Sequence, residues 1–253
     1  MNKPIKDLKA ISRGQLIGKY STCIAATIFI SLIESVCLLI TSGSGGNTLG
    51  TYLIGLLISI IVDLLLGILS YGENYFFLQV ARCNMPLNIS DLFIGFKRNM
   101  DKAILLQAPL TVVALIPALI VACIDFGMIT VSEENYLLVL FLLEFLASLL
   151  IFIAKLFIGL NYYILCDNPE LSVQEIFAKS ISLMKNQKGR LILTYLSLIP
   201  LLLLCVISIV GLLWFGVYLR TILANFYIDV IGEKPHSPYT TDPKDVNHVD
   251  YSI

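Results

Sequence analysis

The chain has 253 residues, of which 57% are hydrophobic and 14% charged, and its mean hydropathy is +0.86. Soluble domains carry roughly 25% charged residues, so lipid must cover much of this surface. The net charge of -1 and the scattered basic residues argue against nucleic-acid binding. The six cysteines form no CxxC pair, which argues against a disulfide framework or a thiolate metal site.

Six apolar segments are long enough to cross the hydrocarbon as helices, which takes about twenty residues each. They lie near residues 16–40, 49–71, 103–124, 136–160, 191–210 and 212–231. Strands are disfavoured because an open sheet cannot satisfy its backbone in lipid and no barrel-type alternation is present. We therefore expect an all-α polytopic membrane helix bundle, with one domain over residues 1–233 and a flexible polar tail over 234–253. If the last apolar stretch crosses once and then lies flat, the tail is on the outer side.

Lys and Arg are distributed unevenly between the connections of these spans. Fifteen of the seventeen fall before the first span, in the second or fourth connection, or in the tail. They are Lys3, Lys6, Lys9, Arg13 and Lys19; Arg82, Lys97, Arg98 and Lys102; Lys179, Lys185, Lys188 and Arg190; and Lys234 and Lys244. Because positive charge beside spans stays in the cytoplasm, we expect a multi-pass protein of the cell membrane with both termini cytoplasmic.

The second and fourth connections resemble each other at an offset of 84 residues. Leu87, Asn88, Ile89, Asp91, Leu92, Phe93 and Met100 align with Leu171, Ser172, Val173, Glu175, Ile176, Phe177 and Met184. Upstream, Asn74 and Tyr75 echo Asn161 and Tyr162. Ser172 with Glu175 has capping-box spacing, and Asn88 with Asp91 is a looser version of it. The two connections therefore predict helices near residues 88–101 and 172–188.

Both expected helices carry an apolar stripe beside basic residues. Phe93, Phe96 and Phe177 are the candidate anchors in these stripes. The pattern suits two amphipathic helices lying in the cytoplasmic interface. A short helix packed on the ends of the spans fits it equally well, and chance similarity between two amphipathic loops is a third interpretation.

Five charged residues lie within the expected spans: Glu34, Asp63, Glu144, Lys155 and Arg220. Charge in hydrocarbon is costly, so these residues are the default candidates for a proton or substrate path. At about 1.5 Å per residue, Glu34, Glu144 and Arg220 share one depth, and Asp63 and Lys155 share another. We expect Arg220 to pair with Glu34 or Glu144, and Lys155 with Asp63. The simpler interpretation is that these pairs only fix how the helices pack.

Enzymatic patterns are missing from the sequence. His236 and His248 are the only histidines, and both lie in the polar tail. There is no Walker loop, GxSxG, HExxH or Rossmann glycine pattern. We therefore expect no catalytic residues, no cofactor and no metal site.

The chain also carries spaced motifs: G-F-x-R, D-N-P-x-x-S, S-x-x-x-M-x-x-x-K, G-x-x-W-x-x-x-Y and A-x-F-Y. They fall at Gly95, Phe96 and Arg98; Asp167, Asn168, Pro169 and Ser172; Ser180, Met184 and Lys188; Gly211, Trp214 and Tyr218; and Ala224, Phe226 and Tyr227. In these motifs, from about Gly72 onward, the chain resembles the bacterial integral membrane proteins of domain-of-unknown-function family 975. It departs from the family pattern at residues 154–156, where the family usually has a tryptophan and an I-P-G turn.

The resemblance implies a six-span membrane protein without an assigned activity. The family is similar to membrane domains attached to some glycerophosphodiester phosphodiesterases, whose catalytic domain is not visible in this sequence. We expect a non-enzymatic scaffold or accessory subunit in the lipid bilayer that docks a cytoplasmic protein or a lipid partner. The alternative is a small-solute or lipid transporter, and a membrane-embedded enzyme comes third.

Overall fold

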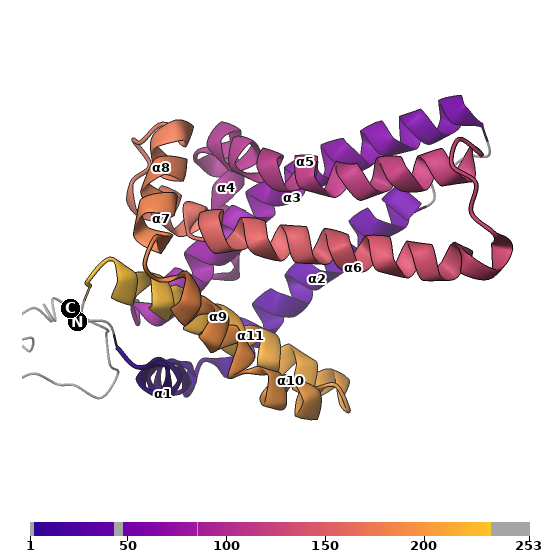
Figure 1. Cartoon of the computed structure of the whole chain (residues 1–253). Coiled ribbons are helices and arrows are strands. Elements are labelled where there is room, and N and C mark those ends of the chain that lie inside the picture. The colour runs from indigo at the N-terminus through magenta and orange to yellow at the C-terminus, as the bar shows by residue number, and fades with distance from the viewer. Residues whose placement is uncertain (1–2, 43–47, 85, 234–253) are drawn as a thin grey trace, which may run out of the picture.

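The computed structural model describes residues 3–42, 48–84 and 86–233, and these residues form helices and no strands (Figure 1). The elements are α1 (Ile5–Leu16), α2 (Tyr20–Ser42), α3 (Leu49–Ala81), η1 (Ile89–Phe93), α4 (Ile94–Lys97), α5 (Met100–Asp125), α6 (Glu133–Ile158), α7 (Asn161–Asp167), α8 (Val173–Met184), α9 (Lys188–Leu196), α10 (Ile199–Cys205) and α11 (Ile209–Val230). Within the described ranges, six helical stretches are long and apolar enough to cross a membrane. The expected all-α polytopic membrane bundle is confirmed.

The six stretches overlap the expected spans, but several of their ends differ. They run over Tyr20–Thr41, Leu49–Ala81, Met100–Asp125, Glu134–Asp167, Lys188–Cys205 and Val210–Val230. The second stretch continues ten residues beyond the expected end at Tyr71, because its polar residues are enclosed by other helices instead of marking a loop. At 33 residues, α3 is about 50 Å long, well over the roughly 30 Å of hydrocarbon.

An amphipathic helix that the sequence analysis did not separate, α1, precedes the first span. Its buried residues recur at helical spacing and are Leu8, Ser12, Gln15 and Leu16. Gly18, with a φ of +77°, turns the chain between α1 and α2, so the first span begins at Tyr20. Gln15 Nε2 donates to the carbonyl of Ala81 at 2.7 Å, and Asn225 Nδ2 donates to Gln15 Oε1 at 2.6 Å. These bonds tie α1 to α3 and α11.

The two amphipathic connections form different structures. The fourth contains α8, one continuous helix whose capping box joins Ser172 and Glu175 as expected. The second contains a 3-10 turn, η1, and a single α turn, α4, and it ends at Lys97 instead of near residue 101. Asn88 makes no side-chain cap, and Asn99 has a left-handed φ of +56° that ends the segment before α5. The first element is therefore shorter than the repeat predicts.

Close approach to α3 accounts for the shape of η1 and α4. A Cβ on Gly72 would lie 1.7 Å from the carbonyl oxygen of Leu92, and one on Gly95 would lie 2.5 Å from that of Ile68. Leu92 is completely buried in this contact, and Ile176 of α8 is equally buried. Both connections thus pack on the ends of the spans, which was one of the two equally weighted interpretations of their stripes.

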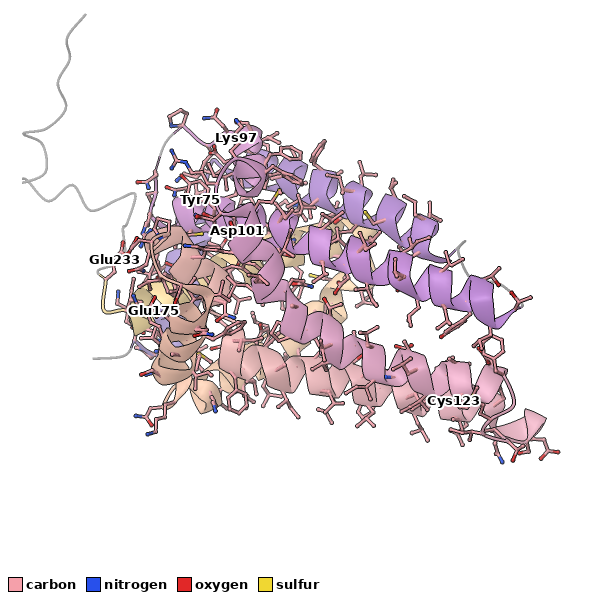
Figure 2. All side chains as sticks on the ribbon, turned by 90° about the horizontal axis from the view of Figure 1, so that it is seen from above. Tyr75, Lys97, Asp101, Cys123, Glu175 and Glu233 are labelled. Atoms are coloured by element: carbon pink, nitrogen blue, oxygen red, sulfur yellow. The ribbon has the colours of Figure 1, made fainter. Side chains whose placement is uncertain are left out.

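The buried core is concentrated toward one end of the bundle. We call this the packed end and define it as α1, η1, α4, α7 and α8, residues 67–81 of α3 and the last turns of α11. The opposite halves of α2, α3, α5 and α6, with α10, extend away from it, and we call them the apolar arms (Figure 1). Figure 2 shows Lys97, Glu175 and Glu233 at the packed end and Cys123 far from them.

The last apolar stretch folds back on itself. Helices α9 and α10 lead away from the packed end, the chain turns at residues 206–208, and α11 packs against α10 on its return. The end of α11 meets the N-terminal segment, where the backbone N–H of Lys3 lies 3.3 Å from both carboxylate oxygens of Asp229. Both ends of the described chain therefore lie at the packed end. The tail, with its two histidines, lies outside the described residues.

Candidate intramembrane cavity

The charge pair inside the bundle joins Arg220 of α11 to Glu73 of α3. Arg220 Nε lies 2.8 Å from Glu73 Oε1, with the two side chains 27% and 16% exposed. The expected pairing of Arg220 with Glu34 or Glu144 is wrong. Both acids lie on exposed sides of their helices, and neither lines the cavity described below. Glu73 was missed because hydropathy ended the second span at residue 71, two residues before it.

Lys155 and Asp63 do not pair either. Helix α5 packs against both α3 and α6, and its polar side chains make hydrogen bonds to the Asp63 carboxylate. Gln107 Nε2 lies 3.3 Å from Asp63 Oδ1, and the Thr111 hydroxyl donates to Asp63 Oδ2. Equal depth in two spans did not imply contact, because a third helix lies between them. Lys155 has no carboxylate within ion-pair distance in the part of the chain that the structure describes.

Arg220, Glu73 and Lys155 line one cavity of about 660 Å³. Its walls come from α3, α5, α6, α7, α9 and α11, with Met184 from the end of α8. The other polar residues on its surface are Ser70, Asn74, Gln107, Asn161, Tyr162, Tyr163 and Tyr195. Its volume falls within the roughly 300–1,000 Å³ of typical small-molecule sites. The cavity is therefore large enough for a ligand and combines charged, amide and phenol groups.

The cavity lies deep in the bundle. Glu73 is eight residues from the end of α3 and Arg220 is ten residues from the end of α11, or about 12 and 15 Å along the helix axes. Arg220 is also near the middle of α11, so the pair lies about halfway along that span. The Arg220 guanidinium carbon lies 5.8 Å from the centre of the Phe77 ring, which adds an attractive contact.

Two asparagines of the cavity are the pair that the internal repeat aligns. Asn74 of α3 donates from Nδ2 to the carbonyl of Ser70 at 2.7 Å. Asn161 begins α7 and is 2% exposed, and its Oδ1 has no hydrogen-bond partner among the described residues. The next residue, Tyr162, donates from its hydroxyl to Gln107 Oε1 at 3.0 Å. The echo of Asn74 and Tyr75 in Asn161 and Tyr162 marks this site in the sequence, as do the intramembrane charges Lys155 and Arg220.

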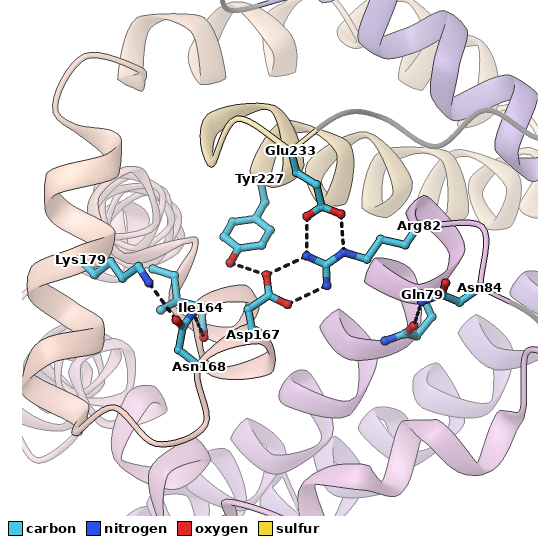
Figure 3. Close-up of polar contacts among 9 residues, drawn as sticks. All are labelled: Gln79, Arg82, Asn84, Ile164, Asp167, Asn168, Lys179, Tyr227 and Glu233. Atoms are coloured by element: carbon cyan, nitrogen blue, oxygen red, sulfur yellow. Dashed lines mark hydrogen bonds and ion pairs between the residues drawn. The ribbon is translucent and has the colours of Figure 1, made fainter. Parts of the chain in front are cut away.

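A second polar cluster closes the packed end (Figure 3). Arg82, which follows α3, donates to both carboxylate oxygens of Asp167 at 2.7 and 2.8 Å and to those of Glu233 at 3.0 and 2.6 Å. Tyr227 of α11 donates to Asp167 Oδ2 at 2.8 Å. The hydrogen bonds from Arg82 to Asp167, with Glu233 next, hold the pKa of Arg82 above its usual value. We call Arg82, Asp167, Tyr227 and Glu233 the Arg82 clamp.

The motif turn after Asp167 is held by lysines from two helices. Lys179 Nζ donates to Asn168 Oδ1 at 3.1 Å, and Lys102 Nζ donates to the carbonyl of Pro169 at 2.7 Å. The Ser172 hydroxyl and backbone N–H donate to Glu175 Oε2 at 2.7 and 2.8 Å, and these bonds lower the pKa of Glu175. The turn residues Asp167, Asn168, Pro169 and Ser172 thus have structural contacts in the described region.

The remaining residues singled out in the sequence differ in their burial and contacts. Met184 is fully buried and lines the cavity, and Lys188 Nζ lies 3.3 Å from the centre of the Phe157 ring. Phe93 and Phe177 are half-buried against the core, whereas Phe96 is 52% exposed. Only Phe96 of the three candidate anchors therefore presents most of its ring to the surroundings.

These helices and this cavity define a polytopic α-helical membrane protein with a polar cavity between its spans. The sequence model of the family described as "Protein of unknown function (DUF975)" matches residues 1–234, so the chain belongs to that family and the resemblance is confirmed. Neither the curated proteins nor the solved structures contain a match to this chain. In the described residues, no group of three or more His, Cys, Asp or Glu side chains is arranged to hold a metal ion.

Proposed function

We propose that this protein is a membrane carrier for a small solute or a lipid, with the cavity as its binding site. The Arg220–Glu73 pair carries the proposal, because it borders a cavity of about 660 Å³ halfway along a span. Buried charges that serve packing alone are normally surrounded by hydrogen-bonding partners. Here the cavity gives the charged pair a face that a ligand can reach.

Filling the cavity tests this proposal. Leu219 of α11 lines the cavity, and Leu212 of the same helix is 40% exposed and does not. Native mass spectrometry of protein extracted with its surrounding lipid should show a bound small molecule. Leu219→Trp should lose that molecule, and Leu212→Trp should keep it. Equal retention in both variants would place the molecule elsewhere and contradict the proposal.

A carrier must also move its ligand. Once the bound molecule is identified by its mass, the protein in proteoliposomes should accelerate its passage across the bilayer. Leu219→Trp should remove the acceleration, and Leu212→Trp should not. Retention of the ligand without any flux would favour a binding protein over a carrier.

We also propose that the packed end faces the cytoplasm in the cell membrane, with both termini on that side. Support comes from the cation-bearing connections, since Arg82, Lys97, Lys102 and Lys179 all lie at this end. In a background without the native cysteines, Ser132→Cys in the connection between the arms should react with an impermeant thiol reagent in intact cells. Asn186→Cys, after α8, should not react. The reverse result would overturn this orientation.

A scaffold that docks a cytoplasmic partner is the second candidate, and exposed Phe96 beside Lys97 and Arg98 favours it. Half-burial of Phe93 and Phe177 weighs against docking through both amphipathic segments. A photoreactive residue at position 97 should cross-link the partner in native membranes, and Phe96→Ser should remove the cross-link without lowering the melting temperature. Without a cross-link that depends on Phe96, the scaffold proposal has no support.

A further inference from the structure

The charges that line the cavity do not balance among the described residues. Glu73 neutralises Arg220, but no described acid is within ion-pair distance of Lys155. Lys155 is exposed and also lines the cavity, so it lies at the opening. The cavity therefore has an excess positive charge at its mouth, where a negatively charged group would be attracted.

Asn161 provides an independent sign of a ligand. Its side chain is 2% exposed and lines the same cavity, yet its Oδ1 accepts no hydrogen bond from the described residues. Leaving a buried acceptor unpaired is costly, so such groups normally meet a donor from protein, water or ligand. A hydroxyl on the ligand would supply that donor.

Most of the remaining lining residues are apolar. Leu110, Phe152, Leu219 and Leu223 face the same space. A compact inorganic anion would leave these side chains uncovered, whereas a hydrocarbon tail would bury them favourably. The helices that carry these side chains belong to spans, so the cavity lies among segments that are apolar enough to cross the bilayer.

Building on the proposed carrier function, we propose that the ligand is an anionic amphiphile. Lys155 binds its phosphate or carboxylate group, Asn161 accepts a hydrogen bond from a neighbouring hydroxyl, and the apolar tail lies against α5, α6 and α11. Arg220 stays paired with Glu73 and orders the inner wall. The assignment follows from the charge of Lys155, the unpaired oxygen of Asn161 and the apolar lining together.

Photolabelling in nanodiscs of phosphatidylcholine tests the assignment. Two trace probes carry the same diazirine-bearing acyl chain, one on phosphatidic acid and one on phosphatidylcholine, and labelled peptides are located by mass spectrometry. The phosphatidic acid probe should label residues of the cavity about tenfold more than the other, because its headgroup is net anionic whereas phosphatidylcholine also brings a cation next to Lys155. Lys155→Gln should remove the preference and Lys155→Arg should keep it. Lys185→Gln, an exposed lysine outside the cavity, is the matched control and should change nothing.

The outcomes separate this inference from the carrier proposal. Equal labelling of the cavity by both probes would overturn the preference for an anion and leave the carrier proposal standing. Inorganic phosphate and unlabelled phosphatidic acid are compared as competitors of the label. If inorganic phosphate competes equally well, the claim that the ligand is an amphiphile is overturned. Absence of cavity labelling with both probes would overturn the inference. If the molecule found by native mass spectrometry were also retained by Leu219→Trp, the carrier proposal would be overturned as well.

Discussion

The two halves of α3 pack in opposite ways. From Gly67 to Ala81, most side chains are buried among α1, η1, α7 and α11, and Phe76, Phe77 and Leu78 are completely buried. From Leu49 to Leu65 the same helix leaves large apolar side chains exposed. One helix thus serves as the core of the packed end and as an arm whose surroundings must be apolar.

The difference shows where protein contacts and where lipid stabilise the fold. At the packed end, close backbone approach, the Arg82 clamp and the buried bonds of Gln15 specify one arrangement. In the arms, neighbouring apolar surface and lipid tails are nearly equivalent, so burial in protein gains little. We expect substitutions at the packed end to be costly and matched substitutions in the arms to be nearly neutral.

The largest difference in stability should be between alanine substitutions at two glycines of α3. At Gly72 a Cβ would meet the Leu92 carbonyl at 1.7 Å, whereas at Gly50 it would meet nothing within 4 Å. Gly72→Ala should lower the free energy of unfolding by about 3 kcal/mol, because backbone must move. Gly50→Ala should leave it unchanged or raise it by up to about 1 kcal/mol. Denaturant titration in mixed micelles measures both, and similar values would contradict the division of α3.

Removing the Arg82 clamp should be the next most damaging change. Arg82→Ala leaves two carboxylates without their cation, so the free energy of unfolding should fall by about 2 kcal/mol. Lys97→Ala, at an exposed position of the same end, should change it by less than about 0.5 kcal/mol. Melting temperatures of the two variants in detergent provide the comparison. A clamp variant as stable as the control would show that the bridge adds nothing to the end it closes.

A smaller difference in stability is expected between neutralising an acid in the cavity and neutralising one in an apolar arm. Glu73→Gln leaves Arg220 without its counter-charge in the span, so we expect a loss of about 1 to 2 kcal/mol. Glu144→Gln removes an exposed charge from an arm that lipid would surround, so stability should be unchanged or higher. Folded yield and melting temperature after extraction measure both. A greater loss for Glu144→Gln would assign that residue a partner outside this chain.

The smallest effect concerns the cap of α8. Because the pKa of Glu175 is lowered in the folded chain, its contribution is complete above the usual carboxyl pKa and is lost as pH falls through the lowered value. On acidification, amide exchange in Val173–Met184 should therefore slow less than its intrinsic pH dependence requires. Glu175→Ala should abolish this extra change. Asp91→Ala should have no such effect on η1, where no side-chain cap is formed.

Hydropathy and charge predicted the class of fold because lipid imposes span length and backbone pairing. The pairing of charges was not predictable from depth alone, since α5 separates Asp63 from Lys155 and places Gln107 and Thr111 against the acid. The role of Glu73 was not predictable, because hydropathy cannot distinguish the end of a span from a helical segment whose polar residues are buried. Helix α1 could have been found, because Leu8, Ser12, Gln15 and Leu16 recur with the period of an α-helix.

The bonds between α1 and α11 have a consequence for synthesis. Ser12 and Gln15 leave the ribosome 213 and 210 residues ahead of their partner Asn225. Because chains emerge from the N-terminus onward, the contacts of α1 with α3 can form before its contacts with α11, which require the last described span. Truncation anywhere before Asn225 should remove the bonds that α1 makes to α11 and leave α1 more open to proteases that clear unfinished chains.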